Sequence, residues 1–254
     1  MAERLDGTVA LVTGASSGIG AATARALAAE GAAVALGARR KDRLEELAAA
    51  ITGDGGRALV IEADITDAEQ AADAVRRTVT DLSRLDTVIN NAGVMLLGPA
   101  ADAPLEEWQR MVAINVNGLL YVAHAALPHL TEAAADGPRR VADVVNVSSV
   151  AGRVARAGSG VYNLTKHGVG AFSESLRQEF SPKHVRVSLV EPGSVDTELR
   201  EHLRPEIREA QEKRFAGVER LAASDIADTI AHIVTRPRHM AINEVLVRPT
   251  EQAG

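Results

Sequence analysis

A serine, a tyrosine and a lysine stand at short spacing in the second half of the chain. The largely apolar run Val144–Ser149 predicts a buried strand with the hydroxyl of Ser149 at its carboxyl end. Tyr162 follows thirteen residues later, and Lys166 lies one helical turn beyond it on the same helix face. An ammonium about 4 Å from a phenol oxygen contributes roughly 4 kcal/mol at an effective dielectric near 20, which predicts a Tyr162 pKa lowered by up to about 3 units. These side chains indicate general acid and base chemistry, with a packed helix tyrosine as the alternative.

A glycine-rich turn follows the first apolar run of the chain. Val9–Val12 predicts a strand, and Ala21–Glu30 has the pattern of a helix. Between them, Gly14 and Gly18 would let the backbone approach a pyrophosphate, and Gly20 would let the helix pack on the strand. The helix N-terminus offers unpaired N–H groups and a positive dipole end. The arrangement predicts a dinucleotide site, with an ordinary tight turn as the alternative.

The end of the second predicted strand indicates which dinucleotide binds. An acidic residue about 20 positions after the glycines would bond the ribose hydroxyls of NAD, but Ala38 supplies no carboxylate. Arg39 and Arg40 can instead give charge-assisted hydrogen bonds to a 2′-phosphate. The sequence therefore favours NADP(H). The neighbouring Lys41 and Arg43 leave open a basic helix start, for Arg40 more than for Arg39.

Seven short aliphatic runs alternate with alanine-rich helical stretches. They are Val9–Val12, Ala33–Leu36, Ala58–Ile61, Thr87–Ile89, Val141–Val147, Arg186–Val190 and Glu244–Val247. Continuous apolar strands separated by helices are typical of a parallel sheet covered on both faces. We expect a doubly wound, Rossmann-type α/β fold with seven parallel strands. No Pro-, Gly- or Ser-rich linker divides the chain, which predicts one domain over residues 1–254.

The glycine spacing and the Ser149, Tyr162, Lys166 set resemble the short-chain dehydrogenase/reductase family, from Val9 to about Thr250. The resemblance implies that Tyr162 protonates a carbonyl oxygen, Ser149 hydrogen-bonds that oxygen, and Lys166 also holds the nicotinamide ribose. It implies that the main chain of Asn115 holds a water in a proton relay.

The same resemblance implies a set of cofactor contacts. In the glycine turn they are Gly14, Ser16, Ser17, Gly18, Ile19 and Gly20, followed by Arg39, Arg40 and the adenine-contacting Asp64. Later in the chain they are the turn Asn91, Ala92 and Gly93, then Tyr162 and Lys166, then Pro192, Gly193, Val195 and Thr197. Val195 would contact the nicotinamide carboxamide and Thr197 a phosphate.

The substrate is a small aldehyde or ketone, or the corresponding alcohol, if the resemblance holds. Ile242–Thr250 and Val94–Pro99 resemble the clavulanate-aldehyde reductase and 3-hydroxy-acid dehydrogenase members of the family. A 3-oxoacyl-carrier-protein reductase is the alternative among enzymes. The alternative outside enzymes is an NADP(H)-sensing binding protein, which would be expected to lack Tyr162 or Lys166.

The composition excludes some functions and disfavours others. The chain has no cysteine, which excludes thiol chemistry and disulfides. A formal net charge of -6 disfavours nucleic-acid binding. The N-terminus shows no signal-peptide core and no run of about 18 apolar residues is present, so we expect a cytoplasmic protein that binds no membrane. The seven histidines form no metal-binding set.

The substrate pocket is expected to be lined by residues 94–97, 150–160 and 194 to about 214. Only Arg153 and Arg156 offer a charge for an acidic substrate, and both can instead face solvent. Segment 198–214 alternates acidic and basic residues, which is typical of a solvated helix, with a lid over the pocket as the alternative.

Two predicted helices, Leu119–Leu130 and Val161–Leu176, are apolar over more than one stripe. One side of each is expected to meet the sheet and the other a second subunit. This predicts a homodimer or homotetramer, in agreement with the habit of the family that the chain resembles.

Overall fold

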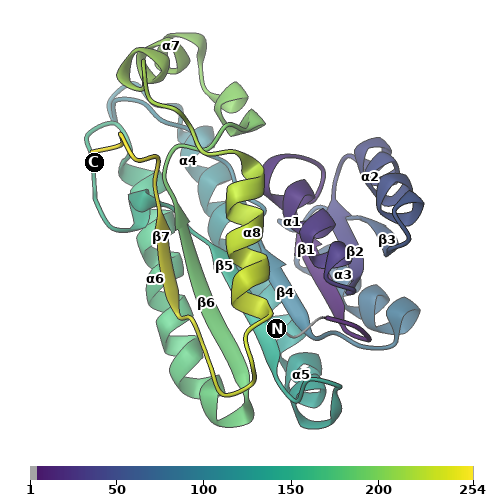
Figure 1. The fold of residues 1–254 in the computed structure, drawn as a ribbon. Helices are drawn as coiled ribbons and strands as arrows, with labels where there is room; N and C mark the ends of the chain where they lie inside the picture. The colour runs from purple at the N-terminus through teal and green to yellow at the C-terminus, as the bar shows by residue number, and fades with distance from the viewer. Residues whose placement is uncertain (1–4, 254) are drawn as a thin grey trace.

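The computed structural model describes residues 5–253, and its centre is one sheet of seven parallel strands in the order β3-β2-β1-β4-β5-β6-β7 (Figure 1). The first four residues, part of the N-terminal stretch considered above, lie outside the described residues. The strands are β1 (Val9–Thr13), β2 (Ala33–Ala38), β3 (Arg57–Glu62), β4 (Thr87–Asn90), β5 (Ala142–Val147), β6 (Val185–Pro192) and β7 (Glu244–Val247). This confirms the predicted doubly wound α/β fold.

Helices cover both faces of the sheet (Figure 1). One face packs against α1 (Gly18–Ala29), α2 (Lys41–Gly53) and α8 (Ala223–Val234). The other packs against α3 (Ala68–Leu82), α5 (Leu119–Asp136) and α6 (Gly160–Phe180). The remaining elements are α4 (Leu105–Val112), α7 (Pro205–Arg214), and the short turns η1 (Ala113–Gly118), η2 (Val150–Gly152), η3 (Ser181–Lys183) and η4 (Glu198–His202).

The central strands are apolar at nearly every position because each face carries its own core. Along β1, Val9 and Leu11 belong to the core under α3 and α5. Ala10 and Val12 belong to the core under α1 and α8. Successive side chains of a strand point to opposite faces, so burial on both faces removes the usual alternation of polar and apolar residues.

The observed elements extend beyond several predicted bounds. Strand β6 continues to Pro192 rather than ending at Val190, because Glu191 and Pro192 pair with Leu246 and Val247 of β7. Helix α5 continues to Asp136, and α6 runs from Gly160 to Phe180. Strand β7 has the predicted bounds.

Helix α4, η1 and α5 form one continuous helical run of 32 residues. Length and composition alone would allow this run to cross a membrane. Val122, Ala126 and Leu130 on α5 are, however, fully buried in the core beside α3. The core helix of a globular protein meets the same criterion, and these contacts are of that kind.

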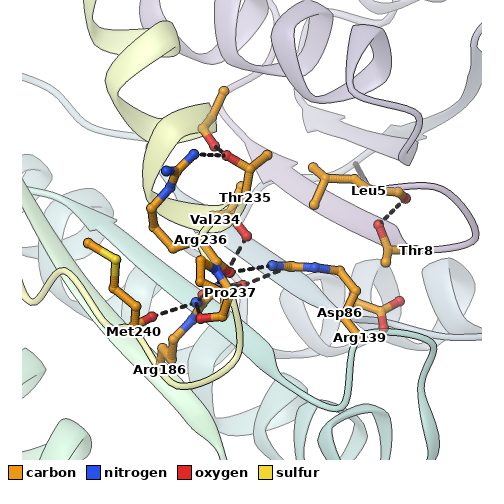
Figure 2. Close-up of polar contacts among 12 residues, drawn as sticks. Leu5, Thr8, Asp86, Arg139, Arg186, Val234, Thr235, Arg236, Pro237 and Met240 are labelled. Carbon is orange, nitrogen blue, oxygen red and sulfur yellow. Dashed lines mark hydrogen bonds and ion pairs between the residues drawn. The ribbon is translucent and has the colours of Figure 1, made fainter. Parts of the chain in front are cut away.

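A buried guanidinium joins β5 and β6 to the end of α8 at the amino edge of the sheet, and Figure 2 shows its contacts with the chain at and after the end of α8. Arg186 donates from Nε and Nη2 to the two carboxylate oxygens of Asp143, at 2.7 and 2.9 Å. It also donates to the main-chain carbonyls of Val234, Arg236 and Met240. Carbonyls at a helix C-terminus lack intrahelical partners, and a cation is favoured there by the helix dipole. This contact holds β6, which leads into the site at its other end.

Candidate active site

A cavity of about 410 Å³ lies along the carboxyl ends of the strands. This volume falls in the range of roughly 300–1,000 Å³ that is usual for small-molecule sites. In open parallel α/β sheets, ligands bind at this edge, near the point where the strand order reverses. Here the reversal lies between β1 and β4, and the residues after both strands line the cavity.

The turn between β1 and α1 has the backbone that its glycines require. Gly14 has a φ of +66°, which side chains with a Cβ rarely adopt. A Cβ on Gly20 would lie 2.3 Å from the Gly14 carbonyl oxygen, so only glycine lets α1 approach the turn this closely. Ser17 precedes the helix and does not cap it with its side chain, which leaves the first N–H groups of α1 available to an anion.

Asn91 holds this turn against the neighbouring strand. Its Nδ2 donates to the carbonyls of Thr13 and Gly14, at 3.0 and 3.3 Å. The main-chain N–H groups of Asn91 and Ala92 both donate to Thr13 Oγ1. These bonds fix Ala92 and Gly93 in the cavity wall.

Arg40 lies at the start of α2 and also lines the cavity. Its guanidinium donates to the hydroxyls of Ser16 and Ser17 at 2.8–3.1 Å, and to Glu198 Oε2 at 2.9 Å. Arg43 donates to the other oxygen of Glu198. The hydrogen bond from Arg43 is the largest cause that lowers the pKa of the Glu198 carboxyl, and the hydrogen bond from Arg40 is the next largest. Arg40 is therefore a helix-start residue that also lines the cavity.

Arg39 and Asp64 face each other at the ends of β2 and β3. Arg39 Nη1 lies 3.9 Å from Asp64 Oδ2, and both side chains are exposed to solvent. Asp64 Oδ1 accepts hydrogen bonds from the main chain and hydroxyl of Thr66. Both residues line the cavity.

The loop after β6 closes another wall of the cavity. Pro192, Gly193, Val195 and Thr197 all line it. Thr197 approaches the glycine turn so closely that a Cβ on Gly18 would lie 3.2 Å from its Cγ2. The glycine turn after β1 and the loop after β6, which are the first and the last of the predicted cofactor-binding segments, are thus in contact.

Ser149, Tyr162 and Lys166 converge on the cavity from β5 and α6. The Ser149 hydroxyl lies close enough to the Tyr162 phenol to lower its pKa, and it donates to the Pro192 carbonyl at 3.4 Å. Lys166 Nζ donates to the Val147 carbonyl at 2.9 Å and lies 5.8 Å from the centre of the Tyr162 ring. Tyr162 and Lys166 are only 6% and 7% exposed, so most of each side chain is shielded from solvent.

The pKa values of this pair contradict the sequence prediction. Burial raises the pKa of Tyr162 to about 12, against a smaller lowering by the Ser149 hydrogen bond. Burial also lowers the pKa of Lys166 to about 8. The prediction counted the attraction between the two charged groups and left out desolvation, which disfavours the charged form of each. The Lys166 ammonium also donates a hydrogen bond to the Val147 carbonyl, a contact that the prediction did not include.

Asn115 supports the site from outside the cavity wall. It lies 2% exposed in the single π-helical turn η1, where its Oδ1 accepts from the Val94 N–H at 2.8 Å and its Nδ2 donates to the Val94 carbonyl at 2.9 Å. Nδ2 also donates to Thr165 Oγ1, beside Lys166. Among the predicted site residues, Asn115 and Gly20 do not line the cavity.

The two candidate cations of the substrate end have different environments. Arg153 is paired with the buried Glu191 and with Glu244, and it does not line the cavity. These two carboxylates come from β6 and β7, which the local sequence around Arg153 could not reveal. Arg156 lines the cavity. The expectation is thus corrected for Arg153 and kept for Arg156.

Segment 198–214 has the exposed side chains of a solvated helix and also contributes residues to the cavity wall. Most of its side chains are exposed, as in a solvated helix. Leu199, Gln211 and Arg214 nevertheless line the cavity, and α7 lies beyond the carboxyl edge of the sheet (Figure 1).

Several cavity residues were missed from the sequence. Arg110 on α4 and Gln252 near the C-terminus both line the cavity, and Gln252 Oε1 accepts from the Ser194 N–H at 2.8 Å. No local pattern distinguishes either residue. Within residues 5–253, no three His, Cys, Asp or Glu side chains gather as a metal-binding group.

The family model described as short chain dehydrogenase matches residues 8–208. The chain belongs to this family. Serine 3-dehydrogenase of Rhizobium radiobacter is 38% identical over 250 residues, which cover 98% of this chain and 96% of that protein. Glycine betaine reductase of Emericella nidulans is 37% identical over 251 residues, which cover 98% of this chain and only 19% of that longer protein. The closed form of a serine dehydrogenase complexed with NADP⁺ has a TM-score of 0.88 and 30% identity, with 97% of each chain covered.

This short-chain dehydrogenase is therefore an oxidoreductase of the CH–OH or C=O group, and the family resemblance is confirmed. The geometry of its cavity, considered without the relatives, also suits the phosphate groups of a dinucleotide. The uncapped N-terminus of α1 can receive a pyrophosphate, and the guanidinium of Arg40 lies directly beside it, bonded to Ser16 and Ser17.

The lowered pKa of the buried Lys166 should make the stability of this short-chain dehydrogenase depend on pH. Between pH 8 and 10.5 the unfolded chain holds the Lys166 proton and the folded chain does not. The free energy of unfolding should therefore rise with pH across this window, by up to about 3 kcal/mol. Lys166→Met has no such proton. Its stability relative to the parent should fall across this window, measured by urea unfolding without cofactor at pH 7.5 and pH 10. An unchanged difference would mean that Lys166 titrates near its ordinary pKa.

Proposed function

We propose that this short-chain dehydrogenase transfers a hydride between NADPH and the carbonyl carbon of a small aldehyde or ketone, with alcohol oxidation as the reverse reaction. The observation that carries the proposal is that Ser149, Tyr162 and Lys166 lie together in the wall of one cavity. A serine hydroxyl and a phenol in the same part of a cavity wall can both reach a single carbonyl oxygen.

The cofactor assignment rests on charge at the adenosine end of the cavity. Arg39 and Arg40 line it, and β2 ends in Ala38 without a carboxylate. A guanidinium pairs well with a 2′-phosphate, whereas an acid would be needed to favour NADH. The serine dehydrogenase of similar structure is a complex with NADP⁺. When bound, NADPH supplies the hydride.

Each residue of the site then has a defined task. Ser149 donates a hydrogen bond to the carbonyl oxygen and orients it. Tyr162 donates its proton to the same oxygen, and a pKa of about 12 keeps that proton in place at neutral pH. The Lys166 ammonium stabilises the phenolate that remains. The π-helical turn at Asn115 changes the register of main-chain hydrogen bonds, and we assign its carbonyl to a water that returns a proton.

The substrate is proposed to be small, because Val94, Met95 and Leu97 line the cavity together with Tyr162. The 3-oxoacyl-carrier-protein reductase alternative calls for an acyl thioester instead. Oxidation of NADPH should be screened over aldehydes, β-keto acids, acyl thioesters and cyclic ketones. Turnover confined to acyl thioesters would select the alternative. No turnover of any carbonyl, with NADPH bound, would select the nucleotide-sensing function.

Tyr162→Phe removes the proton donor and keeps the ring that packs in the cavity wall. Turnover should fall by about 10² or more, because general acid catalysis contributes at least this factor. NADPH affinity, measured by fluorescence titration, should stay within about threefold of the parent. Turnover within tenfold of the parent would contradict the assignment of Tyr162 as the acid.

We also propose that the protein is cytoplasmic and assembles as a homodimer or homotetramer. Leu120 on α5 and Leu164 on α6 are 36% and 65% exposed, although the opposite sides of both helices are buried. Apolar side chains of this kind are typical of subunit interfaces. Light scattering at micromolar concentration should give at least twice the mass of one chain, with a tetramer preferred, and the mass of a single chain would contradict this.

A further inference from the structure

Arg40 has hydrogen-bond acceptors on both sides of its guanidinium. Its Nε and Nη2 atoms donate to Ser16 Oγ at 3.1 and 3.0 Å, and Nη2 also donates to Ser17 Oγ at 2.8 Å. Its Nη1 atom donates to Glu198 Oε2 at 2.9 Å. A phosphate oxygen that pairs with Arg40 must therefore share these donors with the two serines and Glu198, or take the place of one of them.

The two kinds of acceptor behave differently beside a phosphate. A serine hydroxyl can rotate and donate its own proton to a phosphate oxygen, so Ser16 and Ser17 can keep their places. An ionised carboxylate only accepts hydrogen bonds, and it repels a second anion. The hydrogen bond from Arg43, followed by that from Arg40, lowers the pKa of the Glu198 carboxyl, which is therefore ionised at neutral pH. Among the partners of Arg40 within residues 5–253, Glu198 is thus the one that a phosphate has to displace.

Glu198 is held beside Arg40 by its own contacts and by those of its neighbours. Its Oε1 accepts a hydrogen bond from Arg43 Nη1 at 2.5 Å, so one carboxylate bridges two guanidinium groups. Thr197, the residue before it, packs on the glycine turn after β1. Leu203, just beyond η4, is 5% exposed and packs in the apolar cluster of the cavity wall. Glu198 therefore competes for Arg40 as a positioned group and not as a freely moving surface side chain.

A competitor for Arg40 acts on one cofactor only. NADPH and NADH differ in the 2′-phosphate on the adenosine ribose, and Arg40 lines the part of the cavity after β2. Strand β2 ends in Ala38, so it brings no carboxylate of its own to this position. The carboxylate beside Arg40 comes instead from η4, which follows β6 on the other side of β1 and β4.

We propose that Glu198 is a specificity residue for the cofactor: its carboxylate competes with the 2′-phosphate of NADP(H) for Arg40, and so limits how strongly the enzyme prefers NADPH over NADH. The inference rests on the proposed assignment of Arg40 to the 2′-phosphate and is independent of the carbonyl substrate. Glu198 takes no part in the hydride or proton transfer.

The test uses 2′,5′-ADP and 5′-AMP, two fragments of the cofactor that differ only in the 2′-phosphate. Isothermal titration calorimetry on the whole protein measures both affinities without turnover. The parent should bind 2′,5′-ADP more tightly by roughly ten- to hundredfold, the usual effect of a charge-assisted hydrogen bond. Glu198→Gln should bind 2′,5′-ADP about three- to tenfold more tightly than the parent does, because it removes a partly exposed competitor. Its affinity for 5′-AMP should stay within about twofold, which also shows that the fold is intact.

Two further variants make the result specific. Glu201→Gln, also on η4, removes the same charge from a residue that makes no hydrogen bond or ion pair within residues 5–253. It should change neither affinity by more than about twofold. A double-mutant cycle with Arg40→Gln tests whether Glu198 acts through Arg40. In the Arg40→Gln background, Glu198→Gln should leave the affinity for 2′,5′-ADP unchanged.

The outcomes separate this inference from the assignments on which it rests. An unchanged or weaker affinity of Glu198→Gln for 2′,5′-ADP would overturn the competition, and so would an equal gain for 5′-AMP. An equal gain in Glu201→Gln, or a gain that persists in the Arg40→Gln background, would show a general effect of charge and overturn it as well. Equal affinities of the parent for the two fragments would overturn the assignment of Arg40 together with this inference. The proposed hydride transfer would stand in every case, because the titrations measure no turnover.

Discussion

The parallel register of the strands is the constraint on which the site depends. Asn90 pairs with Asn146, and Asn146 pairs with Leu189, so the residues that follow β4, β5 and β6 emerge at the same edge of the sheet. In the same way Thr13 pairs with Gly37, which brings the glycine turn level with the arginines after β2. A slip of one residue in any of these strands would turn its apolar side chains to the other face, so core burial and site geometry are fixed together.

Burial of Tyr162 and Lys166 opposes stability and suits the proposed chemistry. Tyr162 and Lys166 are held where neither charge is solvated, which disfavours both the phenolate and the ammonium. The neutral phenol that results is the form required to donate a proton to a carbonyl oxygen. The Val147 carbonyl accepts a hydrogen bond from Lys166 Nζ, which gives the buried lysine a polar partner.

Much of the fold and of the site could be predicted from the sequence because its signals are local. The strands were recognisable as apolar runs, and the residues of the glycine turn, of the turn after β4 and of α6 do meet in one cavity. Contacts between distant segments could not be predicted. The predicted strand ended at Val190, and no local pattern showed that the next residue, Glu191, pairs with Arg153. Arg153, which was expected at the substrate end, does not line the cavity.

The segment over the cavity is a second example of this limit. Its alternating charges are typical of any solvated helix, and nothing in them reveals that Glu198 bridges Arg40 and Arg43 across more than 150 residues of sequence. The pKa of Tyr162 is a third, because desolvation depends on packing that no spacing of residues discloses.

The central claim is that a hydride passes from the nicotinamide to a carbonyl carbon in this cavity. It is tested most directly with NADPH deuterated at one or the other C4 position and a carbonyl compound found in the substrate screen, with the product examined by mass spectrometry and proton NMR. One of the two labelled forms should deliver a single deuterium to the carbinol carbon of the product. A reduced product without deuterium at that carbon from either form would contradict the account.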